Sequence, residues 1–412
     1  MDACAAARPR VQAGTQPKET GLFSRRRQWR TAWLKLHLYL GLSLGLVFVI
    51  IGLTGSLLVV GQSLDHWLNP TLFATIRTAP GPAVARPLSE IIAAAKAVIP
   101  RQTEWGTIGF SQGDQRVFTF RYRVPSGQPE RFDDYDVLVD AGTATVTGVR
   151  RWYQPTRPWA GPLLSVIMYL HVSLLLDQPG ATAVGYLATI LFLSIISGLI
   201  LWWPSPKRWK QAFSVRRSGG TVRMNRDVHN VVGALSALVL FMLLFTGITM
   251  YEPVNVIPLT VAKLFSPLSD PPANLHSTSI PGQPPLTPEN AAAISLTVWP
   301  DAALRSIELP RGEDGVFHLS MRTPGDINDR ELWIDQYRGV VLHTKHPGTN
   351  TRADTFWSWL FPLHTGEAFG LPGRIVVFIA GLVPLILFIT GLVMWRPRRR
   401  VVGRQRKTSM VL

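Results

Sequence analysis

Cysteine is almost absent from this 412-residue chain, in which Cys4 is the only one. A single thiol excludes an intramolecular disulfide, a cysteine-ligated iron–sulfur cluster and a C-x-x-C-H haem attachment site. No Gly-x-Gly-x-x-Gly or comparable nucleotide cradle is present either, so we do not expect this chain to oxidise NAD(P)H by itself. Acidic residues are also scarce, with 26 against 42 lysines and arginines, which gives a net charge of +16.

Charged side chains are missing from four long apolar runs, whose only ionisable residues are histidines: 36–60, 181–203, 228–251 and 375–395. Each run reaches the roughly 20 residues that a helix needs to cross the hydrocarbon core of a bilayer. The mean hydropathy of the whole chain is only +0.16, and 17% of its residues are charged. The sequence therefore predicts four transmembrane helices together with substantial segments outside the membrane.

The basic residues predict the orientation. Lysine and arginine number 8 in residues 1–36, 7 in 204–227 and 7 in 396–412, together 22 of the 42 in the chain. Because basic flanks remain on the cytoplasmic side, both termini and the middle loop are expected there. The net charge is thus a topology signal, and we expect no nucleic-acid partner.

The chain is a duplication. His37 and His229 are each followed by glycine at the fourth position and by Thr-Gly at the seventeenth, as in "HLYLGLSLGLVFVIIGLTG" and "HNVVGALSALVLFMLLFTG". His171 precedes Ser197-Gly198 by 26 residues, and His364 precedes Thr390-Gly391 by 26. Each half then contains two spans and enters the membrane in the same sense, which predicts a parallel repeat about an axis along the membrane normal. The blocks between the spans also match, each with a short helix followed by a β-hairpin or meander.

The repeated histidines are the candidate site. The repeat axis places His37 opposite His229 near the cytoplasmic face, and His171 opposite His364 near the outer face. Each pair brings two imidazoles to the same depth in the membrane, and two such pairs could provide the axial ligands of two haem irons. Three alternatives remain: interfacial histidines without a ligand, a zinc or copper site, which wants three or four ligands, and a proton relay, which usually includes intramembrane acids.

Nearby cations and the other histidines are weaker candidates. Lys35, Arg226 and Arg374 are candidates to neutralise haem propionates, or are ordinary interface charges. Five histidines have no counterpart in the other half: His66, His276, His318, His343 and His346. For the two in "LHTKHPG" we expect a solvated loop, and contact with an external metal complex is the alternative.

The sequence resembles the PepSY-associated transmembrane family of iron-regulated bacterial inner-membrane proteins. The resemblance covers about residues 28–397 and rests on "KLHLYLGLSLGLVFVIIGLTGSLL", "NRDVHNVVGALSALVLFMLLFTGI", "PLHTGEAFGLPGRIV" and the blocks ending "VLVDAGTATVTGV" and "LWIDQYRGVV". The family includes ferric-siderophore reductases with two non-covalent b-type haems in four spans. The resemblance implies that His37 and His229 ligate the inner haem, and His171 and His364 the outer one. The first half departs from the pattern, with "YLHVSLLLDQPG" where the second half has His-Thr-Gly-Glu.

The expected fold is an α+β membrane protein with four transmembrane helices in two parallel repeats and two PepSY-like α+β extracytoplasmic domains. In the first half we expect a basic cytoplasmic tail (1–33), helix 1 (34–60), a periplasmic PepSY-like domain (61–160), an interfacial segment with His171 (161–180) and helix 2 (181–203). A basic cytoplasmic loop (204–226) leads to helix 3 (227–251), a second periplasmic domain (252–350), an interfacial segment with His364 (351–373), helix 4 (374–396) and a basic tail (397–412).

The expected function is transmembrane electron transfer by a membrane-bound oxidoreductase of the ferric-chelate reductase type. A separate donor, a quinol or a cytoplasmic reductase, would reduce the inner side, and a periplasmic iron complex such as a ferric siderophore would accept the electron. Two alternatives without redox chemistry remain: a PepSY-type module that binds or inhibits periplasmic peptidases, and a transporter or assembly factor.

Overall fold

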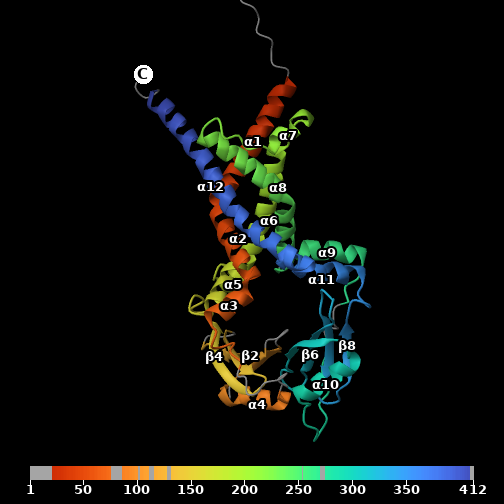
Figure 1. Cartoon of the computed structure of the whole chain (residues 1–412). Coiled ribbons are helices and arrows are strands. Elements are labelled where there is room, and N and C mark those ends of the chain that lie inside the picture. Colours follow the sequence, from red (N-terminus) through yellow and green to blue (C-terminus); the bar gives the residue numbers. More distant parts are fainter. Residues whose placement is uncertain are drawn as a thin grey trace, which may run out of the picture.

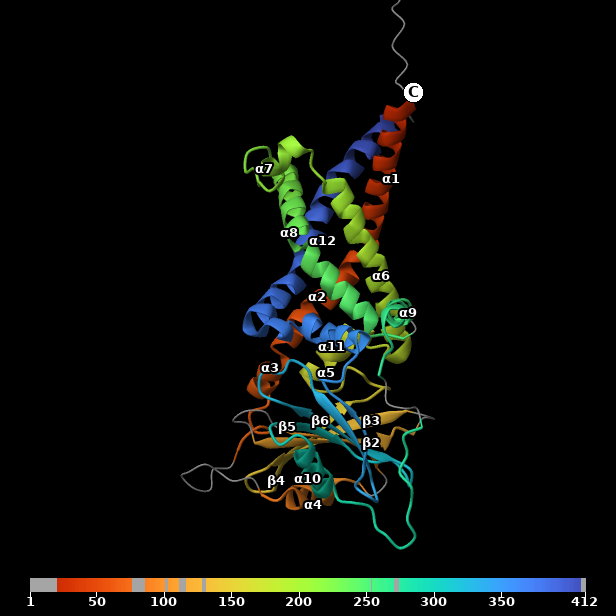
Figure 2. The ribbon, with the colours of Figure 1, turned by 90° about the vertical axis from the view of Figure 1, so that its right-hand side faces the viewer.

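Figure 1 presents the computed structural model of the chain, which describes residues 21–75, 86–100, 103–110, 116–127, 131–252, 254–269 and 274–408. Cys4 and most of the basic N-terminal tail lie outside these residues. A bundle of long helices forms one end of the molecule, and a β-sheet covered by two helices forms the other (Figures 1 and 2).

The bundle contains five helices, α1 (Gly21–Ser43), α2 (Gly45–Val59), α6 (Asp177–Trp202), α8 (Thr221–Thr249) and α12 (Gly370–Thr408). Within the described residues, α6, α8 and α12 are each long and apolar enough to cross a membrane. The pair α1–α2 adds a fourth span if it is counted as one. Helix α8 begins at Thr221, before the expected start at 227, so Arg226 is already helical.

The first expected span is bent. Helices α1 and α2 meet at an angle of 58° around Leu44, where the sequence expectation was one helix over 34–60. Glycine and serine residues cluster at the bend, in Gly41, Ser43 and Gly45, and such residues are common at helix kinks. A Cβ atom on Gly45 would lie 2.6 Å from the Phe388 ring of α12, so the bend lets a neighbouring aromatic ring fill the space beside the backbone.

Three close helix contacts hold the bundle together: α2 with α12, α8 with α12 and α6 with α8. In the sequence repeat α2 corresponds to α8 and α6 corresponds to α12, so the α2–α12 and α6–α8 contacts are equivalent. At the α2–α12 contact a Cβ atom on Gly52 would lie 2.6 Å from the Gly381 carbonyl oxygen. Ser56 donates across the same contact to the Phe378 carbonyl at 2.7 Å. Small residues here allow the backbones to approach, as is usual between helices in a membrane.

Eight antiparallel strands form one continuous sheet in the order β4-β3-β2-β1-β5-β6-β7-β8. The first half provides β1 (Glu104–Gly109), β2 (Val117–Pro125), β3 (Phe132–Asp140) and β4 (Thr145–Tyr153). The second half provides β5 (Ala303–Glu308), β6 (Val316–Arg322), β7 (Arg330–Asp335) and β8 (Val341–Lys345). The two meanders join where Ile108 of β1 pairs with Ile307 of β5. Pairing of β1 with β5 removes one exposed edge from each meander, which explains the joining.

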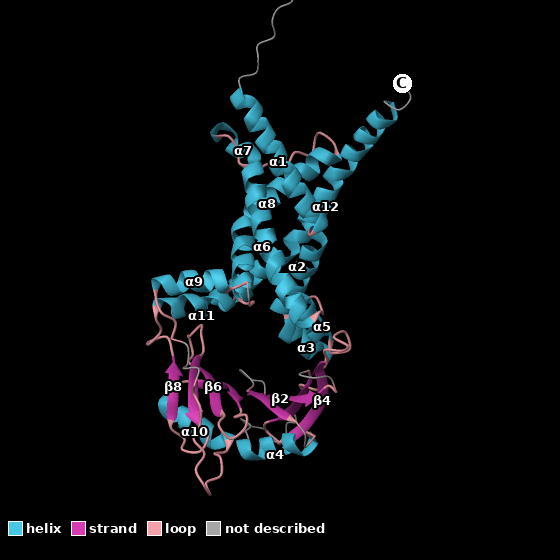
Figure 3. Ribbon diagram, turned by 180° about the vertical axis from the view of Figure 1, so that it is seen from behind, coloured by secondary structure: helices cyan, strands magenta, loops and turns pink. Residues whose placement is uncertain are grey.

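Helices α4 (Leu88–Val98) and α10 (Pro288–Val298) cover the sheet face that points away from the bundle (Figures 1 and 3). Helix α4 buries Ile91 and Ala95 against the β3 residues Val137 and Val139. A matching cluster surrounds Ala291 of α10. Turns at "DAGT" and "DQYRG" join β3 to β4 and β7 to β8, and in the second one Asp335 accepts the N–H groups of Tyr337 and Arg338. Its pKa is lowered, because these hydrogen bonds outweigh the opposing effect of burial.

Short helices connect the bundle with the sheet on its other face: α3 (Gly61–Leu68), α5 (Leu163–Ser173), α9 (Val256–Phe265), α11 (Arg352–Thr365) and the 3-10 turn η2 (Glu367–Phe369). At the opposite end of the bundle, η1 (Pro206–Arg208) and α7 (Trp209–Ala212) lie in the basic loop. Arg150 of β4 donates twice to Asp65 of α3, at 2.9 Å each, and both side chains are nearly buried. Arg150 also contacts Asp136 at 3.4 Å, whereas removing Arg150 would take away the cation that pairs with the buried Asp65, so this ion pair fixes α3 on the sheet.

Candidate site of paired histidines

The four repeated histidines meet in two pairs. The ring centres of His37 on α1 and His229 on α8 lie 6.3 Å apart, with the ring planes at 86°. The ring centres of His171 on α5 and His364 on α11 lie 6.2 Å apart, with the planes at 58°. These are the partners expected from the repeat, and each pair takes one histidine from each half.

Each imidazole is held through Nδ1 by a hydroxyl group on another helix of its own half. His37 contacts Ser197 at 2.9 Å and His229 contacts Thr390 at 2.9 Å. His171 contacts Thr54 at 3.3 Å, and also the Ile51 carbonyl at 2.9 Å. His364 contacts Thr246 at 2.9 Å. All four hydroxyl residues are buried.

The hydrogen-bond network fixes the tautomer of the rings. Thr54, Thr246 and Thr390 each donate their hydroxyl proton to the carbonyl four residues earlier, at 2.7–2.8 Å. Ser197 donates to the Ser194 carbonyl at 2.7 Å. Since these protons are already used, the hydroxyl oxygens accept from the imidazoles, and each histidine carries its proton on Nδ1. The lone pair on Nε2 is then free, and in the described part of the chain Nε2 of these four rings makes no hydrogen bond.

A glycine follows each of the four hydroxyl residues and lies against the same ring. A Cβ atom would lie 2.9 Å from His171 Cε1 if added to Gly55, and 3.0 Å from His37 Cε1 if added to Gly198. The equivalent distances are 3.4 Å for Gly247 and His364, and 3.8 Å for Gly391 and His229. The repeated Thr-Gly and Ser-Gly dipeptides are therefore ring cradles, in which the hydroxyl orients the imidazole and the glycine makes room for it.

The spacing within each pair fits one metal ion. An imidazole nitrogen binds a metal at about 2.0 Å, so two rings on opposite sides of one ion have their centres about 6.4 Å apart, once the ring radius is added on each side. The observed separations are 6.3 and 6.2 Å. Histidines that bind a metal through one ring nitrogen typically form a hydrogen bond through the other, as these four do through Nδ1. The donor set of two neutral imidazoles thus fits the axial positions of a haem iron, and Gly41, one turn beyond His37, faces open space.

The two pairs lie at opposite ends of the bundle. We call His37 and His229 the inner pair, and His171 and His364, which lie nearer the sheet, the outer pair. Helix α8 connects the two, because it carries His229 of the inner pair and, 17 residues later, Thr246, which contacts His364 of the outer pair. At 1.5 Å per residue, this is a separation of about 25 Å along the helix. Within the described ranges, no three side chains of His, Cys, Asp or Glu come together as a metal site would require.

The expected propionate partners divide between the two ends. Lys35 and Arg226 are exposed and precede His37 and His229 by one turn or less on the same helices. Arg374 lies near the start of α12 on the outer side, where its guanidinium donates to the Val59 carbonyl at 2.6 Å. Among the residues that the structure describes, none of the three forms a hydrogen bond or ion pair with a histidine of the pairs, so the propionate role stays a prediction.

The unpaired histidines belong to the sheet and its connections. His318 stacks on Trp333 with ring centres 4.5 Å apart and lies 3.6 Å from Glu308, whose pKa is lowered chiefly by this hydrogen-bonded neighbour. The loop expectation is wrong for His343, which lies in β8 and packs 5.3 Å from the same tryptophan ring.

The Thr-Gly and Ser-Gly dipeptides were predicted only as markers of the repeat and not as partners of the histidines. Their constant spacing from the histidines shows that they recur, but it does not indicate which ring each hydroxyl contacts.

One protein family, described as the PepSY-associated TM region, has a sequence model that matches residues 34–398 of the chain. No curated protein matches the chain.

Proposed function

Because the chain belongs to the PepSY-associated transmembrane family and is a multi-pass membrane protein, we propose that it is a di-haem electron conduit that reduces a ferric chelate on the outer side of the membrane. The observation that supports this proposal most directly is the meeting of the four repeated histidines in two pairs, with 6.3 and 6.2 Å between ring centres.

When bound, two b-type haems would supply one-electron redox chemistry at the inner and outer pairs. His37 and His229 would hold the first, and His171 and His364 the second. The hydroxyl groups of Ser197, Thr54, Thr390 and Thr246 keep the Nδ1 proton in place and thereby present a neutral ligand on Nε2.

Hydrogen bonds to the four buried hydroxyl groups hold the rings in place. A rigid ligand set keeps the geometry the same in both oxidation states, which favours electron transfer over ligand exchange.

The overall reaction is balanced by a donor and an acceptor outside the chain. Each electron converts one Fe(III) chelate to Fe(II), and a quinol donor would provide two electrons and release two protons, so that it reduces two chelates. A cytoplasmic reductase would serve equally as the donor. Reduction loosens oxygen-donor chelates, because Fe(II) binds hard oxygen ligands more weakly than Fe(III) does.

The absorption spectrum of the purified full chain tests this proposal. We expect a dithionite-reducible b-type spectrum with two haems per chain, and loss of one component in His37→Ala or His229→Ala. His276→Ala is the matched control, because His276 is exposed and, among the described residues, hydrogen-bonds only with the nearby Asn274 carbonyl. Protein produced with ample haem but lacking this spectrum would refute the conduit and favour the peptidase-binding alternative.

A further inference from the structure

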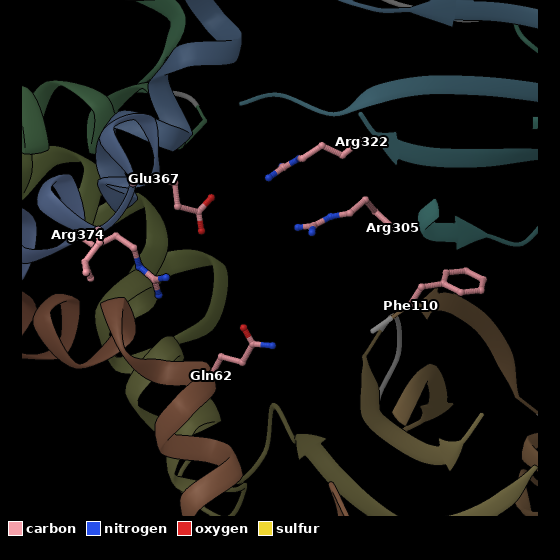
Figure 4. A pocket seen from close by; sticks show the side chains of 8 residues that line it. Gln62, Phe110, Arg305, Arg322, Glu367 and Arg374 are labelled. Atoms are coloured by element: carbon pink, nitrogen blue, oxygen red, sulfur yellow. The ribbon is translucent and has the colours of Figure 1, made fainter. Parts of the chain in front are cut away.

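A polar cavity of about 550 Å³ lies between the sheet and the helices on the outer side of the bundle. Figure 4 shows Arg305 and Arg322 extending from the sheet towards Glu367 and Arg374 on the helix side, with Gln62 and Phe110 at its edge. Cavities of this size accommodate drug-sized ligands. The arrangement is thus a candidate binding site with walls contributed by both parts of the molecule.

Positive charge dominates this cavity. Arg322 pairs with Asp329 at 2.5 Å, and Arg374 donates one N–H to a backbone carbonyl, which leaves its charge uncompensated. Among the residues that the structure describes, no carboxylate forms an ion pair with Arg305. Of the described residues that line the cavity, Glu367 is the one acidic side chain. Three guanidinium groups with their donor forks suit a ligand that has several carboxylate or phenolate oxygens.

The cavity adjoins the outer histidine pair. Glu367 follows His364 by three residues, so their Cα atoms lie at most about 11 Å apart, the reach of a fully extended chain. Gln62 follows Gly55, which contacts the His171 ring, by seven residues on the adjoining helices α2 and α3. The segments that follow two of the helices around the outer pair, α3 after α2 and η2 after α11, therefore line the cavity.

We propose that this cavity is the acceptor site and that it selects anionic ferric chelates, with carboxylate or catecholate ligands, over neutral trishydroxamate chelates. The inference rests on the proposed function for the identity of the metal, but its charge selectivity comes from Arg305, Arg322 and Arg374. Tris-catecholate and citrate-type Fe(III) complexes carry net negative charge, whereas a simple trishydroxamate complex carries none.

Two other anions have the same oxygen chemistry. A phospholipid headgroup would approach from the membrane, and it accounts for Arg374 but not for Arg305 and Arg322, which extend from β5 and β6 on the sheet side (Figure 4). A haem propionate would come from the outer pair itself. The experiment below separates both from a soluble chelate.

Binding of gallium(III) citrate to the full chain tests the proposal without electron transfer, since Ga(III) has the charge and nearly the radius of Fe(III) but is not reduced. Equilibrium dialysis in nanodiscs of zwitterionic lipid measures the affinity. We expect Arg305→Gln and Arg322→Gln each to weaken binding by about tenfold, as for loss of a charge-assisted hydrogen bond. Glu367→Gln is expected to tighten binding severalfold, because it removes the opposing charge.

Arg338→Gln is the matched control, because Arg338 lies in the turn after β7, at the end of β6 and β7 opposite to Arg322. It should leave the affinity unchanged, and a neutral gallium trishydroxamate should bind more weakly than the citrate complex to the unsubstituted protein. Equal affinity for the two chelates, or equal loss in Arg338→Gln and Arg305→Gln, would overturn the proposal.

Two further measurements identify which anion occupies the site. Loss of gallium citrate binding when anionic lipid is added to the nanodiscs would assign the site to a headgroup, and a lowered haem content in Arg305→Gln would assign it to a propionate; either result overturns the inference. If gallium citrate binds as expected but no haem spectrum is found, the anion site stands and the proposed conduit fails. If haem is present and iron is reduced without dependence on these arginines, the conduit stands and the site fails.

Discussion

Alanine substitution at the four ring-facing glycines offers a graded perturbation of the two histidine pairs. The distance from the new Cβ to the ring Cε1 atom would be 2.9 Å at Gly55, 3.0 Å at Gly198, 3.4 Å at Gly247 and 3.8 Å at Gly391. Carbon atoms in ordinary contact lie about 3.5–4.0 Å apart. The same chemical change is therefore a clash at Gly55 and an ordinary contact at Gly391.

The expected magnitudes follow from two opposing terms. Replacing a helix-interior glycine by alanine stabilises the helix by roughly 0.5–1 kcal/mol. Overpacking costs about 1–3 kcal/mol where the neighbour has to move. The His171 ring cannot move away from Gly55 without stretching its 2.9 Å hydrogen bond to the Ile51 carbonyl. We expect Gly55→Ala to be destabilising by up to about 2 kcal/mol, on these terms, and Gly391→Ala to be neutral or stabilising.

Redox titration and thermal unfolding of the four variants measure both effects. Components of the spectrum are first assigned with His171→Ala for the outer pair and His37→Ala for the inner pair. Gly55→Ala should shift or abolish the outer component, whereas Gly247→Ala, at the other histidine of the same pair, should keep it. Identical behaviour of these two variants would refute the cradle role of the glycines.

Two further predictions concern polar groups. Thr390→Val removes the acceptor of His229 Nδ1 and should speed loss of the proposed inner haem to an apo-globin acceptor by about 10–100-fold, as for loss of other hydrogen bonds to metal-ligating histidines; Thr390→Ser keeps the hydroxyl and should restore the wild-type rate, so a serine variant as fast as the valine one would contradict the proposed bond. Asp354 caps α11, and its pKa is lowered because hydrogen bonds from Thr351 and Ser269 outweigh burial. A lowered pKa stabilises the folded state above the unfolded pKa of about 4, and this contribution is lost as the pH falls through the lower folded value. Thermal unfolding should place Asp354→Asn on the order of 1 kcal/mol below wild type at pH 7, with the difference shrinking at lower pH; a gap that is constant with pH would contradict this.

The sequence was sufficient to predict which histidines meet. His37, His171, His229 and His364 have spacings to glycine and hydroxyl residues that recur in both halves, and a repeat of this kind leaves only one symmetric pairing. The structure brings together those partners. Their role as haem ligands remains a prediction, since pairing alone does not identify the bound group.

Other features depend on contacts that a linear pattern does not contain. The bend at Leu44 lies inside an uninterrupted apolar run, and hydropathy reports burial in lipid but not the direction of a helix axis. The joining of the two meanders depends on the pairing of Ile108 with Ile307, almost 200 residues apart. Arg305 and Arg322 likewise become neighbours only through the register of β5 and β6, in which Ala303 pairs with Arg322.

The two halves of the chain contribute differently to orienting the histidines and to pairing them. Each hydroxyl orients a histidine of its own half, as Thr54 does for His171 and Thr246 does for His364. Each pair, by contrast, joins one histidine from each half. One half can therefore orient its two imidazoles but cannot complete either pair. Two identical halves related by a two-fold axis would complete both, since such a contact is self-complementary. The duplicated chain thus places its paired histidines as a symmetric dimer would. Because the two halves are separate stretches of one polypeptide, their residues on the outer side, including those of the proposed anion site, can differ between the halves.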